Sequence, residues 1–200
     1  MPGKFHELTG TPAVRAARAR YYRDTSGPAA APMADALTAD EIEFISRRDS
    51  FYLATVGEGG WPYLQHRGGA PGFLRVLGAT TLTFADYGGN RQLLSVGNLA
   101  ANDRAALFLM DYPSRQRLKI LGHARVEAAQ QQPDLAAQLA DSASRRVVER
   151  IFFVEVAAYD WNCPQHITPR FTAEEVRAVA DPLRRRIVEL EAELATYPKK

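Results

Sequence analysis

Residues 84–93, FADYGGNRQL, are the stretch of this chain best suited to chemistry. A strand-like run over residues 81–85 is followed by two glycines, and Asn90 and Arg91 then open a helix predicted over residues 91–101. Such a junction leaves backbone N–H groups unpaired at the positive end of a helix dipole, beside an arginine. That arrangement binds a phosphate or another dianion. An ordinary turn with a solvated arginine explains the same residues, so this segment alone leaves both interpretations open.

Three further arginines, Arg67, Arg75 and Arg117, lie in segments that a folded chain can bring to the same place. Arg67 precedes a glycine-rich break, where a backbone can approach a ligand closely. Guanidinium groups bind phosphate oxygens in a bidentate manner, which the point charge of lysine cannot do. Residues 51–116 contain five arginines and no lysine, which favours a phosphate ligand. The alternative is a general preference of this chain for arginine.

The C-terminal part offers a second group of candidate contacts in Trp161, Gln165 and His166. An aromatic ring and an amide suit the edge of a flat heteroaromatic ligand, which needs both stacking and hydrogen bonds. A tryptophan that simply packs at the end of the last strand is an equally good interpretation.

Other common chemistries find no support in the sequence. The single cysteine excludes an internal disulfide and a multi-cysteine metal site, and the four histidines lack metal-binding spacing, so we expect no metal. The sequence contains no Gly-x-Ser-x-Gly, Gly-x-Gly-x-x-Gly or Walker motif, which argues against a hydrolase elbow and against Rossmann or P-loop nucleotide binding. No catalytic side chain can be assigned.

Composition limits the partners that we expect. The chain has 200 residues, 46% of them hydrophobic, and a net charge of +2. This charge does not indicate nucleic-acid or membrane-surface binding, and no apolar run is long enough to span a membrane. One cysteine fits a reducing compartment, so we expect a cytoplasmic protein.

Hydrophobic periodicity predicts a mainly β fold with flanking helices. Six or seven short strands joined mostly by tight turns indicate an antiparallel barrel, closed or nearly closed. The strand-like runs are 51–56, 61–66, 73–77, 81–85, 105–110, 117–126 and 150–157. We expect an N-terminal arm at 1–35, a barrel domain at 36–160, and a C-terminal tail and helix at 161–200.

Helix signals flank these strands. Residues 12–22 favour a short helix, and capping boxes at Thr38 and Thr172 predict two more helix starts. Another helix is expected over 133–142. Asp181 and Pro182 are expected to restart a helix, whose apolar stripe packs on the barrel or across a dimer interface. The stripe consists of Leu183, Ile187, Leu190 and Leu194.

Four motifs together resemble the pyridoxamine 5′-phosphate oxidase-like, FMN-binding split-barrel family. They are QHRGGAPGFLR at 65–75, FADYGGNR at 84–91, RLKILG at 117–122 and WNCPQH at 161–166. The resemblance covers about residues 38–170 and is greatest to a branch described as predicted flavin-nucleotide-binding proteins. It implies an antiparallel split β-barrel, FMN as cofactor, and a homodimer with two flavin sites at its interface.

The resemblance also implies roles for individual residues. Arg75, Asn90 and Arg91 match residues that hold the flavin phosphate, and Arg67 stands for another arginine of that site. Gln92 replaces a lysine that is usual in the oxidases. Arg117 takes a position near the flavin ring that is often a glutamine, and Trp161 resembles an aromatic that covers flavin from the other subunit. The complete expected set is Arg67, Arg75, Asp86, Gly89, Asn90, Arg91, Gln92, Arg117, Trp161, Gln165 and His166.

The function implied is a flavin-dependent oxidoreductase that uses a small-molecule substrate or an electron donor such as NAD(P)H. The Arg-x-His motif that binds the substrate phosphate in the oxidases is not evident, so oxidation of pyridoxamine phosphate itself is not implied. The alternative is a non-catalytic module of the same fold that binds or stores flavin or haem.

Overall fold

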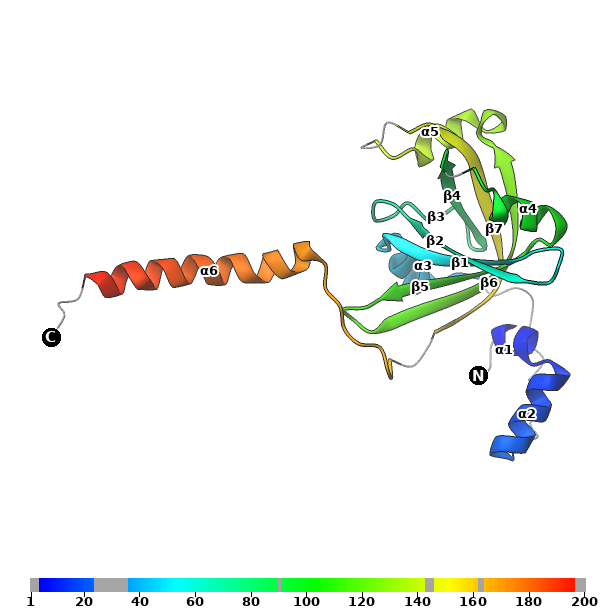
Figure 1. Ribbon diagram of the computed structural model, residues 1–200, viewed down its shortest axis with the longest axis horizontal. Helices are drawn as coiled ribbons and strands as arrows, with labels where there is room; N and C mark the ends of the chain where they lie inside the picture. Colours follow the sequence, from blue (N-terminus) through cyan, green and yellow to red (C-terminus); the bar gives the residue numbers. More distant parts are fainter. Residues whose placement is uncertain (1–3, 24–35, 90, 143–145, 162–163, 197–200) are drawn as a thin grey trace.

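A curled antiparallel sheet forms the body of the protein, and a long C-terminal helix projects from it (Figure 1). The computed structural model describes residues 4–23, 36–89, 91–142, 146–161 and 164–196. All neighbouring strands run antiparallel, in the order β2-β1-β5-β6-β7-β4-β3. This confirms the predicted mainly β fold with flanking helices. The strands are β1 (Ser50–Val56), β2 (Pro62–Gly68), β3 (Arg75–Val76), β4 (Thr81–Tyr87), β5 (Arg104–Asp111), β6 (Gln116–Ala128) and β7 (Val148–Trp161).

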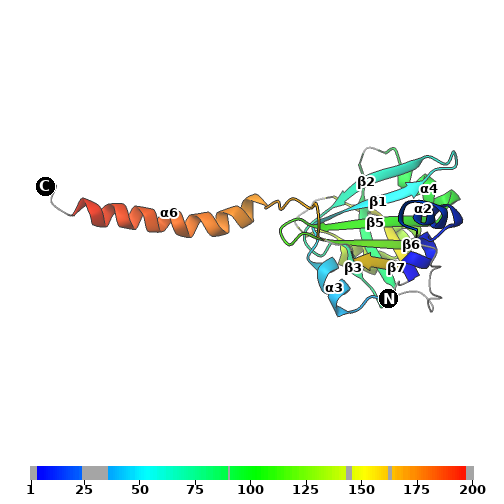
Figure 2. The ribbon, with the colours of Figure 1, turned by 90° about the horizontal axis from the view of Figure 1, so that it is seen from below.

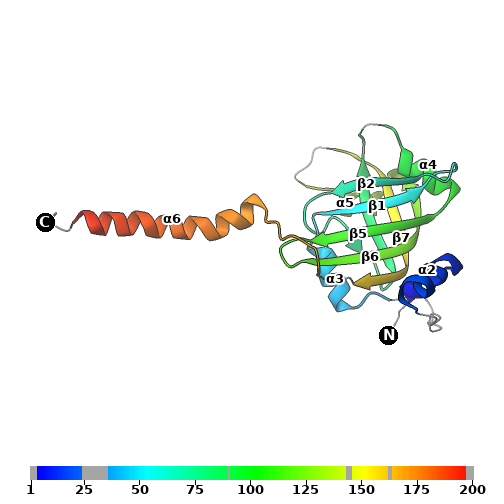
Figure 3. The same ribbon diagram turned by 60° about the horizontal axis from the view of Figure 1, so that its bottom comes forward.

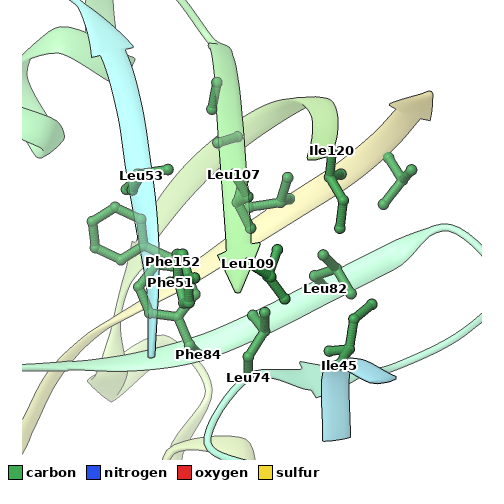
Figure 4. Packing of buried hydrophobic residues seen from close by; sticks show 14 of the residues in the cluster. Ile45, Phe51, Leu53, Leu74, Leu82, Phe84, Leu107, Leu109, Ile120 and Phe152 are labelled. Atoms are coloured by element: carbon green, nitrogen blue, oxygen red, sulfur yellow. The ribbon is translucent and has the colours of Figure 1, made fainter. Parts of the chain in front are cut away.

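The sheet curls around one hydrophobic core. Figure 3 shows β1, β2, β5 and β6 as one layer, with β4 and β7 crossing behind it. Side chains from both layers meet between them, among them Leu53 and Leu107 from one side and Phe84 and Phe152 from the other (Figure 4). The edge strands β2 and β3 are not paired with each other, so the barrel stays split along one side.

The part of the chain that the structure describes contains seven helical segments. The capping box at Thr38 is present at the start of α3, because the Thr38 side chain accepts from the backbone N–H of Glu41 and the Glu41 carboxylate accepts from the backbone N–H of Thr38. None of these helices combines the length and apolar character that crossing a bilayer requires. The segments are α1 (Lys4–Thr9), α2 (Pro12–Tyr22), α3 (Ala39–Ser46), α4 (Leu94–Ala101), the 3₁₀ turn η1 (Ala129–Gln131), α5 (Pro133–Leu139) and α6 (Ala173–Ala195).

Three helix boundaries differ from the sequence prediction, and the simplest case is α5, which ends at Leu139 rather than at residue 142. Helix α4 begins at Leu94 rather than Arg91, since Arg91 and Leu93 both adopt left-handed backbone angles, with φ of 58° and 54°. Helix α6 runs unbroken through Pro182 instead of restarting there. The capping box at Thr172 starts this helix nine residues earlier, and the helix continues through Pro182 although a proline removes one backbone donor and crowds the carbonyl four residues back.

Candidate functional site

A cavity of about 240 Å³ lies at the open side of the barrel, between edge strand β2, the end of β4 and the start of α4. It collects five of the residues predicted from the sequence, and adds others from β2, β7 and α4. The predicted residues that line it are Arg67, Asp86, Gly89, Arg91 and Gln92, and the additional polar ones are Tyr63, Gln65, Tyr87, Ser95 and Arg150. Asn90 lies outside the described residues.

Asp86 is buried and joins two arginines across the split. Its Oδ1 accepts from Nη1 of Arg67 at 2.5 Å, and its Oδ2 accepts from Nε of Arg150 at 2.8 Å. Arg150 also pairs with Glu149 at 2.9 Å. Because Arg67 belongs to β2 and Asp86 to β4, this ion pair connects the two sides of the barrel where no backbone ladder does.

The guanidinium of Arg67 lies against the aromatic core, and one of its donors forms no hydrogen bond to the described residues. The centre of its guanidinium lies 4.9 Å from the ring centroid of Phe152 and 5.6 Å from that of Phe84. Its Nε is buried and has no hydrogen-bond partner among the described residues. A buried donor without a partner is costly, so this position gains from an anionic ligand.

The start of α4 adds backbone donors to the same cavity. Leu94, Ser95 and Val96 line it, and Leu93 supplies no side-chain acceptor as the N-cap. Within the described part of the chain, the N–H groups of Ser95 and Val96 have no acceptor. The positive end of the helix dipole therefore contributes to this cavity, as the sequence predicted for this junction.

The charges around the cavity sum to a positive value. Arg67, Arg91 and Arg150 bring three positive charges, whereas Asp86 and the neighbouring Glu149 bring two negative ones. Arg91 is exposed at the rim. An anion that enters would meet guanidinium donors and free N–H groups, which are donor types that bind phosphate, whereas the hydroxyl of Ser95 already donates to Oε1 of Gln65 at 3.1 Å.

The expected convergence of four arginines within one chain is wrong. Arg75 lines a separate cavity of about 350 Å³ beside the glycine-rich loop 68–72. It pairs with Thr83 in the β3–β4 ladder, and therefore shares the face of Thr83 and Ala85 rather than that of Asp86. Successive side chains along a strand point to opposite faces, so Arg75 and Asp86 lie on different faces of the sheet.

Arg117 lies on yet another surface, the outer face of β5 and β6. It lines an apolar cavity of about 600 Å³ that also contains His166, Phe108 and Met110. The neighbouring Leu118 faces the core, so alternation along β6 turns Arg117 outward. The Nε of Arg117 is buried and without a hydrogen-bond partner among the described residues.

Trp161 packs against its own chain at the end of β7. Its Nε1–H donates to Oε1 of Glu41 at 2.6 Å, and its ring meets that of Phe44 edge-on with centroids 4.7 Å apart. Gln165 is exposed and lines none of these cavities. Within the single chain, Trp161 therefore follows the second interpretation, a ring packed at the end of the last strand.

Sequence reasoning missed Arg150, which pairs with the central carboxylate of the cavity. Arg150 stands directly opposite Asp86 in the β4–β7 ladder. These two residues are far apart in sequence, and nothing in the local pattern indicates which strands become neighbours. The signal that could have identified Arg150 was its position as a charged residue at the start of a strongly apolar strand.

Known proteins provide an independent comparison. The family model described as pyridoxamine 5′-phosphate oxidase matches residues 37–180. The chain therefore belongs to the pyridoxamine 5′-phosphate oxidase family. No curated protein matches it significantly.

Three solved structures resemble this chain at low sequence identity. A putative pyridoxamine 5′-phosphate oxidase from Lactobacillus delbrueckii is 19% identical, with a TM-score of 0.49, covering 64% of this chain and 95% of its own. An FMN-binding protein from Syntrophomonas wolfei is 12% identical, with a TM-score of 0.43, covering 61% and 86%. HutZ, the heme storage protein from Vibrio cholerae, is 16% identical, with a TM-score of 0.39, covering 57% and 85%.

The donors of this cavity suit an anion such as a phosphate group. The unpartnered Nε of Arg67, the free N–H groups of α4 and the excess of guanidinium groups all favour a doubly charged anion. Among the described residues, no three His, Cys, Asp or Glu side chains gather where they would hold a metal ion.

Replacing Asp86 by asparagine should lower the free energy of unfolding by about 2 kcal/mol, because Arg67 and Arg150 lose their common carboxylate in a largely buried position. Urea unfolding measures the loss. Inorganic phosphate should stabilise the variant more than the native protein, since it replaces the missing negative charge. Asp103→Asn, at an exposed pair with His123, is the control and should change stability by less than about 0.5 kcal/mol. Equal stabilisation of Asp86→Asn and native protein by phosphate would contradict the assignment.

Glu41 should make stability depend on acid pH. Burial by itself raises the pKa of this carboxyl, but hydrogen bonds from Thr38, Trp161 and Tyr159 outweigh burial and hold the pKa below its ordinary value of 4.5. The stabilisation is therefore complete above pH 4.5 and is lost as pH falls through the lowered folded-state pKa. Glu41→Gln should lower the free energy of unfolding by about 1–2 kcal/mol at neutral pH and by much less in acid.

Thermal unfolding at a series of pH values tests this prediction. In a Trp61→Phe background, Trp161 is the only tryptophan, so its fluorescence reports the same titration. Glu43→Gln, on the exposed side of α3, is the matched control. A difference between Glu41→Gln and native protein that persists unchanged into acid would refute the role of the ionised carboxylate.

Proposed function

We propose that this protein binds FMN through the cavity around Arg67, Asp86, Arg91 and Arg150, and acts as a flavin-dependent oxidoreductase. The observation that carries the proposal is the buried guanidinium of Arg67, which holds a donor without a partner beside the uncapped start of α4. Membership of the pyridoxamine 5′-phosphate oxidase family supports the same ligand.

Each part of the cavity has a task in this proposal. Asp86 fixes Arg67 and Arg150 before the ligand arrives, so little side-chain freedom is lost on binding. Arg91 at the rim attracts the dianion, and the N–H groups of Ser95 and Val96 donate hydrogen bonds to its oxygens. Bound flavin supplies hydride or electron transfer, and the protein supplies its position and electrostatic surroundings.

The proposal includes a second copy of the chain, because within one chain Arg117 lines a different cavity from the one around Arg67. The outer face of β1, β2 and β5 leaves apolar side chains partly uncovered, including Tyr52, Leu64 and Phe108. Such a face suits a homodimer interface. In that dimer, Arg117 would stabilise negative charge at the pyrimidine edge of a reduced flavin ring, and Trp161 would cover the ring. Light scattering after gel filtration tests the dimer.

The proposed substrate is a small molecule, with NAD(P)H among the candidate electron donors, and the proposed location is the cytoplasm. No side chain is assigned as a general acid or base. Stopped-flow mixing of flavin-loaded protein with NADPH tests the redox activity, because bleaching of the flavin absorbance followed by dye reduction requires turnover. A flavin that binds but is not reduced by either nicotinamide would limit the protein to binding or to another donor.

A non-catalytic module is the second candidate, and the cavity of about 600 Å³ favours haem or flavin storage. Its wall is mainly apolar, and His166, Arg117, Lys119 and Arg170 lie around it. An imidazole and several cations beside an apolar hollow are groups that suit a haem iron and its propionates.

The absorption spectrum of the purified protein separates these candidates. Flavin absorbs in the blue and near ultraviolet, whereas haem gives a Soret band. Mass spectrometry of the molecule released on denaturation identifies it. A colourless protein that takes up neither added FMN nor added haem would refute both candidates.

A further inference from the structure

Helix α6 is a long helix that its own chain leaves uncovered. It has 23 residues, none of them buried, and it stands away from the barrel in two perpendicular views (Figures 1 and 2). At 1.5 Å per residue its length is about 35 Å. Helices of this kind gain most of their stability from packing of an apolar face, and here the chain itself offers no such packing.

Seven apolar residues of α6 follow a heptad pattern. Their spacing alternates between three and four residues along the whole helix, which places them in one seam at positions a and d, while Val179 and Val188 lie outside it at g and b. Ile187 occupies an a position between Leu183 and Leu190 at d positions, and all three are exposed. The complete seam is Ala173, Val176, Ala180, Leu183, Ile187, Leu190 and Leu194.

We propose that α6 pairs with α6 of a second copy of the chain to form a parallel, in-register, two-stranded coiled coil. A β-branched residue at a, flanked by leucines at d, favours two parallel strands. The seam spans the described helix without a charged residue, so the pairing would bury one continuous apolar stripe.

The charges beside the seam select the parallel arrangement. In a parallel pair, Arg186 at g faces Glu191 at e of the second copy, and symmetry gives two such attractive contacts. Of the other g residues, Thr172 and Val179 are uncharged and face Arg177 and Arg184, and Glu193 lies opposite position 198, beyond the described helix. An antiparallel pair with Ile187 opposite Leu183 would bring Arg186 against Arg186 and Arg184 against Arg184, and these two repulsions would offset its two attractive contacts of Arg177 with Glu191.

Pro182 is compatible with this seam. It follows Ala180 by two residues and therefore occupies position c, on the side of the helix away from the partner. Its ring and its missing N–H then disturb only the outer face. The pairing does not rest on flavin binding, because α6 contributes no residue to the cavity around Arg67.

Disulfide cross-linking of the full-length chain tests the arrangement. In a Cys163→Ser background the introduced thiol is the only one. Leu190→Cys lies in the seam, and in the parallel register it faces itself in the second copy. Mild oxidation should convert most of this variant into a disulfide-linked dimer. Arg185→Cys, on the outer face of the same helix, should give at least several-fold less.

Two further measurements make every outcome decisive. Antiparallel pairing would place Leu190 opposite Ala180, so cross-linking only in a mixture of Leu190→Cys and Ala180→Cys would overturn the parallel arrangement. Absence of both cross-links, as expected if α6 packs on a barrel, would overturn the coiled coil.

Helical circular dichroism should fall in Ile187→Glu/Leu190→Glu but not in the outward control Ala178→Glu/Ala192→Glu. Flavin absorbance of the same samples reports separately on the proposed function.

Discussion

Replacing both Arg67 and Arg91 by alanine should weaken FMN binding by about 100-fold or more. Each charge-assisted hydrogen bond contributes about 1.5–3 kcal/mol, and 1.4 kcal/mol corresponds to a tenfold change in affinity. Arg67 is held between Asp86 and two aromatic rings, so its loss removes a positioned donor as well as a charge. Quenching of FMN fluorescence during titration measures the affinity of native protein and variant.

The control for this prediction is Arg75→Ala. Family resemblance assigns Arg75 to the flavin phosphate, but in the folded chain this residue belongs to another cavity, beside the glycine-rich loop. We therefore expect its replacement to change FMN affinity by less than about threefold, in line with the small effect of distant surface charges. A loss with Arg75→Ala that matches the loss with Arg67→Ala would show that the phosphate binds elsewhere.

Phe152→Ala should lower the free energy of unfolding by about 3–5 kcal/mol, the usual cost of removing a large aromatic ring from a packed core. Phe152 is fully buried, and its ring stacks on that of Phe84 with centroids 4.8 Å apart. It joins the two layers of the split barrel and supports the guanidinium of Arg67 at 4.9 Å. Urea unfolding followed by circular dichroism measures the change.

The same substitution should affect the candidate site. Removing the ring leaves a space beneath Arg67, so FMN affinity measured on the folded fraction should also fall. Phe171→Ala is the matched control, because Phe171 is exposed and should change neither property appreciably. An unchanged midpoint of unfolding for Phe152→Ala would mean that the two layers are not packed through this residue.

Local signals in the sequence predicted the elements well. Alternating apolar residues indicated all seven strands, and the reciprocal bonds of Thr38 with Glu41 and of Thr172 with Glu175 confirm both capping boxes. These features depend on side-chain spacing and on contacts three residues apart, which a single sequence displays directly. The start of α4 was misplaced because left-handed angles at Arg91 and Leu93, neither of them glycine, have no local signature.

The sequence by itself determined which groups this protein has for an anion: several arginines, a glycine break and a helix start within one antiparallel barrel. Tertiary structure decided which of them meet. The β4–β7 ladder sets Arg150 opposite Asp86, and the split between the edge strands lets Arg67 reach the same carboxylate. The two-residue period of β3 and β6 turns Arg75 and Arg117 toward other surfaces. Strand order and register depend on contacts between distant residues, and for that reason only the folded chain shows which arginines share a cavity.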